Sequence, residues 1–388
     1  MVCFDLSFGV SVARMRTPLV SVLIPAYNAE EWIAETLQSA IAQTWQRKEI
    51  IVVDDGSRDR TAEVARRFAS KDVKIVSTEN RGLSAAVNLA YRLCQGDYIQ
   101  ELDSDDLISP NKIEKQLAAL RESDSKQTLL SSPWAYFYYR PQRARFVASS
   151  LWRDHTPVEW LLRKLGENLL MQNATWLVSR ELAEAAGPWD ESLQYDQDGE
   201  YFTRVIVASR NIRFVPEGKV FYRTGGSSRI SVMGDSDKKR DSMLVSMKVH
   251  IQRLRSLEES ERVREACLTY IQNWYHNFYP DRRDIVAELQ GLAAELGGTL
   301  RPPELRWKYA WLKPIVGQRA ARRAQTLLPQ LKSSLVRSWD KASYRLELRR
   351  HAHRTELLDS AAGKSWAQWT RIGTRSHQES QSGPTRAG

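Results

Sequence analysis

The chain has 388 residues, of which 42% are hydrophobic and 27% charged, and its formal net charge is +10. This apolar content is enough for a sizeable core, which excludes a wholly disordered chain, and no apolar run approaches the roughly 18 residues of a membrane-spanning helix. Three widely separated cysteines argue against a disulfide framework or a zinc site, and the first residues lack the features of a targeting signal. We therefore expect a cytoplasmic protein with one large domain and an appendage.

Strands and helices alternate in the first half of the chain. Short apolar runs predict the strands, and apolar residues at helical spacing predict the helices between them. In chain order we expect a strand at Val20–Ile24, a helix at Glu30–Gln43, a strand at Glu49–Val53, a helix at about Asp59–Phe68, a strand at Val73–Val76, a helix at Leu83–Cys94, a strand at Tyr98–Leu102 and a helix at Pro110–Arg121. This order is typical of a Rossmann-like α/β fold with a mixed, mainly parallel sheet flanked by helices.

The second half of the chain is less regular and becomes helical towards its end. We expect strands at Trp134–Tyr139, Ala174–Val178, Ile212–Val215 and Val220–Tyr222, and helices near Val158–Lys164 and Gly199–Ser209. Long helical patterns follow at Ser236–Leu257, Ser260–Phe278 and Asp281–Leu296, and basic helices come after them. The last part, from about Gly363, is polar and predicts a disordered tail.

Three polar motifs follow three of the predicted strands, at the edge where parallel sheets bind ligands. They are Pro25-Ala26-Tyr27-Asn28, Asp54-Asp55-Gly56-Ser57 and Asp103-Ser104-Asp105-Asp106. Tyr27 offers a ring that stacks on a base, and Asp55 offers an acceptor for a pyrimidine N–H. The alternative is that these residues only shape turns. Their matching positions after three strands favour a nucleotide site.

Asp103 and Asp105 are two residues apart, so both side chains face the same way on an extended backbone. Two such oxygen ligands suit Mg²⁺ or Mn²⁺, with water and phosphate oxygens in the remaining positions. The alternative is a solvated loop that caps the next helix. The neighbouring motifs favour the divalent metal.

Read together, the motifs resemble family 2 glycosyltransferases of the GT-A fold over roughly Leu19–Arg223. The strongest matches are VSVLIPAYNAEEWIAETLQSAIAQTW, EIIVVDDGSRDRT, ENRGLSAAVNLAYRLCQGDYIQELDSDD and GPWDESLQYDQDGEYFTRV. The resemblance implies an enzyme that binds a nucleoside-diphosphate sugar with a divalent metal. It further implies transfer of the sugar, with inversion, to a hydroxyl of a glycan, a lipid-linked acceptor or a polysaccharide precursor.

The resemblance also implies roles for individual residues. Pro25 and Tyr27 would line the nucleoside pocket, and Asp55 would meet the base. Asp103 would lie near the ribose or the sugar, and Asp105 would bind the metal. Asp198 would be the general base, and the alternative is that it caps the helix that follows.

Two positions depart from the family pattern. Val87 stands where many relatives have an arginine, so we expect Arg81 to contact the diphosphate instead. Gln197 precedes Asp198 where the family commonly has glutamate. Trp176 and Trp189 are candidates for a wall that stacks on the acceptor sugar, and the alternative for both is packing in the core.

The positive charge is concentrated near the C-terminus. Residues 301–350 contain thirteen lysines and arginines against three acidic residues, a surplus equal to that of the whole chain. With Trp307, Trp311 and Trp339, this segment would suit peripheral contact with an anionic membrane; the alternative is a solvated helical hairpin packed on the main domain. We expect no nucleic acid as partner.

The sequence predicts five segments. They are an N-terminal extension (1–17), the GT-A glycosyltransferase domain (18–226), a helical extension (227–300), a basic helical appendage (301–362) and a disordered tail (363–388). The competing function is a non-catalytic nucleotide-binding protein of this fold with a basic tail for a membrane or nucleic acid. The intact acidic residues favour the enzyme.

Overall fold

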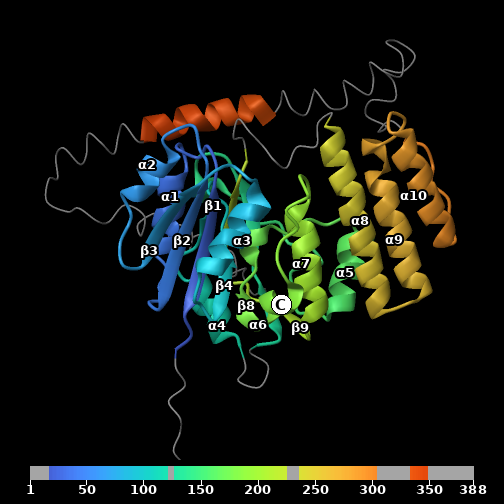
Figure 1. The fold of residues 1–388 in the computed structure, drawn as a ribbon, viewed down its shortest axis with the longest axis horizontal. Helices are drawn as coiled ribbons and strands as arrows, with labels where there is room; N and C mark the ends of the chain where they lie inside the picture. Colours follow the sequence, from blue (N-terminus) through green and yellow to red (C-terminus); the bar gives the residue numbers. More distant parts are fainter. Residues whose placement is uncertain (1–16, 121–125, 225–235, 304–332, 348–388) are drawn as a thin grey trace, which may run out of the picture.

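The computed structural model describes residues 17–120, 126–224, 236–303 and 333–347. Figure 1 shows an α/β layer on one side and a group of long helices on the other. The predicted N-terminal extension and the tail, together with Trp307 and Trp311, lie outside the described residues.

The centre of the α/β layer is a five-stranded sheet in the order β3-β2-β1-β4-β8. Its parallel strands are β1 (Val20–Ala26), β2 (Lys48–Asp55), β3 (Val73–Thr78) and β4 (Tyr98–Glu101). The short strand β8 (Val178–Ser179) pairs antiparallel with β4. The alternating helices are α1 (Ile33–Ile41), α2 (Thr61–Arg66), α3 (Leu83–Leu93) and α4 (Lys112–Ala118). The predicted fold class, a mainly parallel sheet flanked by helices, is confirmed.

Two smaller sheets extend this layer. Strand β10 (Val220–Arg223) lies between β5 (Leu107–Ile108) and β7 (Trp134–Phe137), antiparallel to the first and parallel to the second. Strands β6 (Thr128–Ser131) and β9 (Asn211–Phe214) pair in parallel. Further helices are η2 (Pro141–Arg143), α5 (Pro157–Gly166), η3 (Asn173–Thr175), α6 (Arg180–Ala186) and α7 (Gln197–Ala208).

The prediction of a strand at Ala174–Val178 is wrong for most of its length. The chain forms the 3-10 turn η3 there, Trp176 is extended, and Leu177 makes an isolated bridge with Leu130 before β8 begins. The cause is local, because the side chain of Gln172 accepts the N–H of Ala174 at 2.6 Å and so closes a turn. Helix α6 follows at once and was not predicted.

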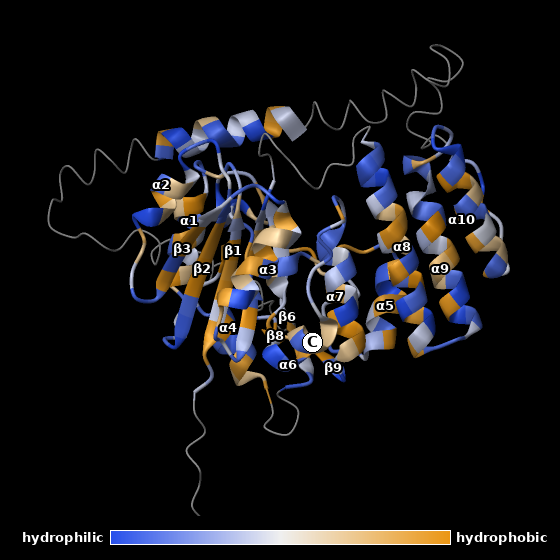
Figure 2. Cartoon of the chain, in the orientation of Figure 1, coloured by the Kyte–Doolittle hydropathy of each residue, from blue (hydrophilic) through white to orange (hydrophobic). Residues whose placement is uncertain are grey.

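The central sheet is buried on both faces, and alternate residues of each strand point to opposite sides. Leu23, Ile51 and Val53 face a cluster that includes α3, α5, α7 and the helical extension. Val22, Ile24 and Val52 face the other cluster, under α1, α2 and α4. Figure 2 shows the strands as mostly hydrophobic and the helices as hydrophobic on one side.

The helical extension consists of α8 (Asp237–Leu257), α9 (Glu261–Trp274), η4 (Tyr275–Asn277) and α10 (Arg283–Glu295). Its apolar residues belong to the same buried cluster as α5 and α7. A last helix, residues 333–347, lies across the top of the α/β layer in Figure 1. A helical C-terminal region is thus confirmed. Within the described ranges, no helix is both long and apolar enough to cross a membrane.

Candidate active site

The first two motifs meet at the carboxyl ends of β1 and β2. Pro25 is buried within β1 beside Val53 of β2, whereas the Tyr27 side chain just beyond it is 39% exposed. Asn28 joins the two loops, because its Oδ1 accepts the N–H of Arg58 at 2.8 Å and its own N–H is donated to Ser57 Oγ at 3.0 Å. An accessible aromatic ring therefore lies at the mouth of a rigid double loop.

Asp55 at the end of β2 organises the loop that leads into α3. Its Oδ1 accepts the N–H of Arg81 at 2.8 Å, and its Oδ2 accepts the N–H of Gly82 at 2.9 Å. Burial raises the pKa of Asp55 above its ordinary value, although these two N–H donors lower it. The carboxylate of Asp55 is thus fixed in direction at the end of β2.

The acidic motif after β4 is held by residues from distant parts of the chain. Asn173 Nδ2 donates to Asp103 Oδ1 at 3.0 Å. Asp106 is fully buried and accepts Gln172 Nε2 at 2.5 Å and the backbone N–H of Arg223 at 2.7 Å. Asp106 is therefore a structural residue, and it fixes the loop that carries Asp103 and Asp105.

Arg223, the last residue of β10, is the main cationic support of this loop. Its Nε donates to the carbonyl oxygen of Asp105 at 2.7 Å, and its Nη2 pairs with Glu35 of α1 at 2.6 Å. The guanidinium also lies between two aromatic rings, 4.1 Å from the centroid of Trp32 and 4.4 Å from that of Phe137. With a side chain only 1% exposed, Arg223 holds the backbone of the motif in one position.

Asp198 lies in the first turn of α7, near the acidic motif. Its carboxylate contributes to the raised pKa of both Asp103 and Glu101, so the three groups lie within electrostatic range of each other. Burial and the neighbouring carboxylate Asp196 raise the pKa of Asp198 to about 6, while Lys164 lowers it. Asp196 occupies the N-cap position of α7, although its side chain makes no capping hydrogen bond, and Asp198 lies further on, inside the helix.

The helical extension fixes Asp196 in turn. Asp196 has a left-handed backbone, with φ +57°, and it accepts a hydrogen bond from Ser246 of α8. His250 of α8 lies 3.7 Å from the same carboxylate and bonds the Tyr270 hydroxyl at 2.9 Å. A side chain at Gly199 would collide with Asp196, since an added Cβ would lie 2.2 Å from Oδ1. The loop before Asp198 is therefore positioned from α8 and α9.

The acidic motif fits a divalent cation. Burial and the neighbouring Asp105 raise the pKa of Asp103 to about 7, and a cation between these carboxylates would relieve their repulsion. Among the described residues, no group of three His, Cys, Asp or Glu side chains could hold a metal. The two aspartates would therefore share the ion with water and phosphate oxygens, as magnesium sites commonly do.

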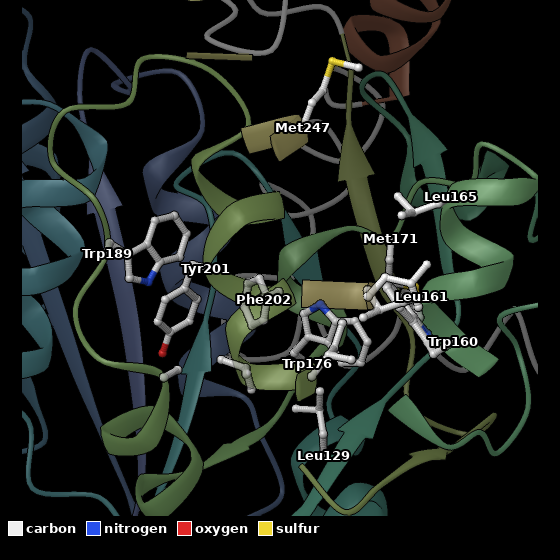
Figure 3. Close-up of a cluster of buried hydrophobic side chains, with 14 of the residues drawn as sticks. Leu129, Trp160, Leu161, Leu165, Met171, Trp176, Trp189, Tyr201, Phe202 and Met247 are labelled. Atoms are coloured by element: carbon white, nitrogen blue, oxygen red, sulfur yellow. The ribbon is translucent and has the colours of Figure 1, made fainter. Parts of the chain in front are cut away.

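Trp176 and Trp189 do not form the predicted acceptor wall in this structure. They are 2% and 4% exposed, and Figure 3 shows both rings in the aromatic core. Trp176 stacks on Phe202 with centroids 5.8 Å apart, and Trp189 stacks on Tyr201 at 4.8 Å. Their ring faces are covered, so we leave them out of the acceptor site. The indole N–H of Trp189 still matters, because it donates to Glu101 Oε1 at 3.2 Å.

The departures from the family pattern have clear positions. Val87 is buried in the core and offers no diphosphate contact. Arg81 is exposed beside Asp55 and pairs with Glu191 at 3.0 Å, so its guanidinium lies at the cleft. Gln197 is buried and donates to the carbonyl oxygen of Leu193 at 3.3 Å. Asn88 binds the backbone of Trp189 in both directions, at 2.8 and 2.9 Å, which anchors the loop before α7.

Sequence reasoning missed several residues that shape the site. They are Glu35, Glu101, Lys164, Asn173, Asp196 and Arg223. For the turn before α7 the sequence offered two signals. They are the aspartate at position 196, a residue type that tolerates the positive φ found there, and the glycine at position 199. The local sequence around the other five residues gives no signal of their role. Each of them acts on a residue that is distant in the sequence, or it acts through its charge.

Comparisons with known proteins agree with the family resemblance and with the fold. Residues 21–177 match the family model described as glycosyl transferase family 2. An uncharacterised glycosyltransferase of Rickettsia typhi is 32% identical over 193 residues, which cover 50% of this chain and 60% of the relative. Chondroitin synthase of Escherichia coli is 40% identical over 114 residues, 29% of this chain and 17% of the synthase. The chain thus spans about 60% of the length of the Rickettsia relative and much less of the synthase.

Among solved structures, residues 1–349 of Staphylococcus aureus TarS, crystallised with UDP-GlcNAc, share the fold. The TM-score is 0.57 at 17% identity, over 71% of this chain and 81% of that one. This likeness concerns the fold alone, and it confirms the GT-A arrangement expected from the sequence. The motifs, the match over residues 21–177 and the fold agree, and this part of the chain is similar to glycosyl transferase family 2.

Proposed function

We propose that this chain transfers a sugar from a nucleoside-diphosphate donor to a hydroxyl acceptor, with inversion and with help from Mg²⁺ or Mn²⁺. One observation carries the proposal. Asp103 lies within electrostatic range of Asp105 in the same motif and of Asp198 from α7, and the pKa of Asp198 is raised to about 6. A carboxylate with this proton affinity is suited to accept a proton near neutral pH.

The donor would be held by the loops after β1 and β2. The exposed ring of Tyr27 would stack on the base, with Pro25 behind it in β1. Asp55, fixed by two backbone N–H donors, would meet the base, and Arg81 would approach the diphosphate. TarS, which shares this fold, was crystallised with UDP-GlcNAc, and this supports a nucleotide sugar as donor.

The reaction would be a single displacement. The acceptor oxygen forms a bond to the anomeric carbon while the bond from that carbon to the diphosphate oxygen breaks, and Asp198 takes the hydroxyl proton. Asp103 would orient the sugar, since Asn173 fixes its carboxylate. One attacking group on one face leads to inversion. We assign the role of base to Asp198, and a base that takes the proton of the acceptor hydroxyl fits a direct displacement.

Asp105, with Asp103 beside it, would hold the divalent cation. When bound, the cation neutralises charge on the departing diphosphate. Arg223 prepares the loop for this role, because it fixes the Asp105 carbonyl from behind and leaves the carboxylates to the cleft.

The acceptor would be a glycan, a lipid-linked sugar or a polysaccharide precursor. The partial match to a chondroitin synthase supports a carbohydrate acceptor. We place the reaction in the cytoplasm, because Cys94 and Cys267 are free thiols, as expected in a reducing compartment.

A donor screen tests the proposal. The purified chain is incubated with UDP-, dTDP- and GDP-sugars, with Mg²⁺, Mn²⁺ or EDTA, and release of nucleoside diphosphate is measured. We expect metal-dependent release with one class of donor. Asp198→Asn should bind the nucleotide and lose turnover by about 10²–10⁴-fold. Asp190→Asn is the matched control, since Asp190 is an exposed carboxylate of the preceding loop that bonds only Ser192. Nucleotide binding without turnover in the unmodified chain would refute the proposal and favour a binding protein.

A further inference from the structure

The helix of residues 333–347 is attached to the α/β domain by one side only. Asp340 accepts the backbone N–H groups of Tyr139 and Arg140 at 3.0 and 3.3 Å and pairs with Arg140 Nε at 2.7 Å. Glu347 Oε1 also pairs with Nη1 of Arg140 at 2.9 Å. The Asp340–Arg140 pair is buried, with side chains 11% and 10% exposed. This side of the helix is therefore a specific polar interface.

The attachment reaches the acidic motif of the active site. The Tyr344 hydroxyl donates to Glu35 Oε1 at 2.7 Å. Glu35 in turn pairs with Arg223, which holds the Asp105 carbonyl. The helix thus lies at a fixed place beside the cleft, above the carboxyl edge of the sheet in Figure 1.

The other side of this helix is apolar and uncovered among the described residues. Leu335 and Trp339 are each 74% exposed, and Leu346 is 55% exposed. Their spacing of four and seven residues places them on one stripe of the helix. Trp339 and Leu335 are among the most exposed large apolar side chains of the described chain. A stripe of this kind marks an interaction surface.

Charge identifies the partner. Both acidic residues of the helix, Asp340 and Glu347, are used on the domain side by Arg140. Of the basic residues of the helix, Lys341 also faces the domain, where it pairs with Glu31 at 3.6 Å, whereas Arg345 is exposed. The helix lies within the segment 301–350, where basic residues exceed acidic ones by ten. Tryptophan and leucine beside arginine suit the headgroup region of an anionic bilayer.

We propose that Leu335, Trp339 and Leu346 insert into the headgroup region of an anionic membrane and hold the active site against it. This deepens the proposed function and rests on it, because it selects an acceptor that is carried by a lipid. The tie from Tyr344 through Glu35 to Arg223 would keep the cleft at a constant place relative to the bilayer.

Vesicle co-sedimentation of the full chain tests this surface. We expect the chain to sediment with vesicles of phosphatidylcholine and phosphatidylglycerol in equal parts, and much less with phosphatidylcholine alone. The double variant Leu335→Ser/Trp339→Ser should bind the anionic vesicles about tenfold more weakly or worse. Leu170→Ser is the matched control, because Leu170 is 52% exposed on a different part of the molecule and its change should leave binding intact.

The double variant should fold normally, because both side chains are exposed and the contacts of Asp340 and Tyr344 remain. An unchanged thermal midpoint and unchanged metal-dependent nucleotide release verify this. Equal vesicle binding by the double variant and the unmodified chain would overturn the inference while leaving the proposed function intact. A dimer in light scattering that the double variant abolishes would assign the stripe to a second copy and would also overturn it. If the unmodified chain binds the vesicles but releases no nucleoside diphosphate, the proposed function is refuted instead.

Discussion

Two neighbouring charges act on the pKa of Asp198 in opposite directions, so replacing each of them should shift that pKa in opposite directions. Asp196 raises the pKa of Asp198 and Lys164 lowers it. If Asp198 acts as base, it must be ionised, so kcat/KM should fall about tenfold per pH unit below a pH of about 6. Asp196→Asn removes a negative charge and should move this acidic limb to lower pH. Lys164→Met removes a positive charge and should move it to higher pH.

The expected shift of the acidic limb follows from how far the pKa of Asp198 is raised and from the order of the causes. The pKa of Asp198 rises from 3.8 to about 6, with burial as the larger cause and Asp196 as the second. Burial remains when Asp196 is replaced, so the limb of Asp196→Asn should lie below that of the unmodified chain and still above the ordinary pKa of 3.8. Asparagine also tolerates the left-handed backbone of position 196.

The assay is kcat/KM from nucleotide release at pH 4.5 to 8, with each variant normalised to its own plateau. Normalisation removes any general loss of activity, so only the position of the limb counts. Limbs that shift in the same direction in both variants, or that do not shift, would refute Asp198 as the titrating base.

Two further changes test the framework of the site. Gly56→Ala should destabilise the fold by about 1–3 kcal/mol in urea unfolding and should raise KM for the donor. The reason is that Gly56 has φ +68° and that an added Cβ would lie 2.7 Å from the Asn80 nitrogen. The control Gly291→Ala meets open space in α10 and should be neutral or slightly stabilising. Asp340→Ala should release the last helix, so that trypsin cuts at Lys341 faster while the rest of the chain stays resistant. The exposed Ser338→Ala control should leave the cleavage rate unchanged, and equal protection of Asp340→Ala would contradict the polar anchor.

The sequence predicted the central sheet well because its signals are local. Continuous apolar runs such as those of β1 and β2 occur where both faces of a parallel strand are buried. The positions of Tyr27, Asp55 and Asp105 near strand ends followed, since Tyr27 comes directly after β1, Asp55 is the last residue of β2 and Asp105 lies in the loop after β4. The GT-A fold and the similarity to the family were therefore predictable from residues 19–223.

The supports of these residues were not predictable, because they come from distant parts of the chain. Asn173 meets Asp103 across 70 positions, and Arg223 meets the Asp105 carbonyl across 118. Trp176 and Trp189 illustrate the same limit for packing, since their motif suggested an open wall and their neighbours on α7 cover them. Propensity and spacing contain no information on which helix will cover a given ring.

Arg223 connects the acidic motif to the helix of residues 333–347. Its guanidinium is buried between Trp32 and Phe137, so a change that loosens it leaves a charge without solvent and is costly. The same group binds the acidic motif on one side and, through Glu35, the helix of residues 333–347 on the other. A helix that only covered the domain would not need a link to the loop of Asp105. A helix that fixes the cleft against a bilayer does, because transfer to a lipid-borne hydroxyl requires donor and acceptor at a constant separation.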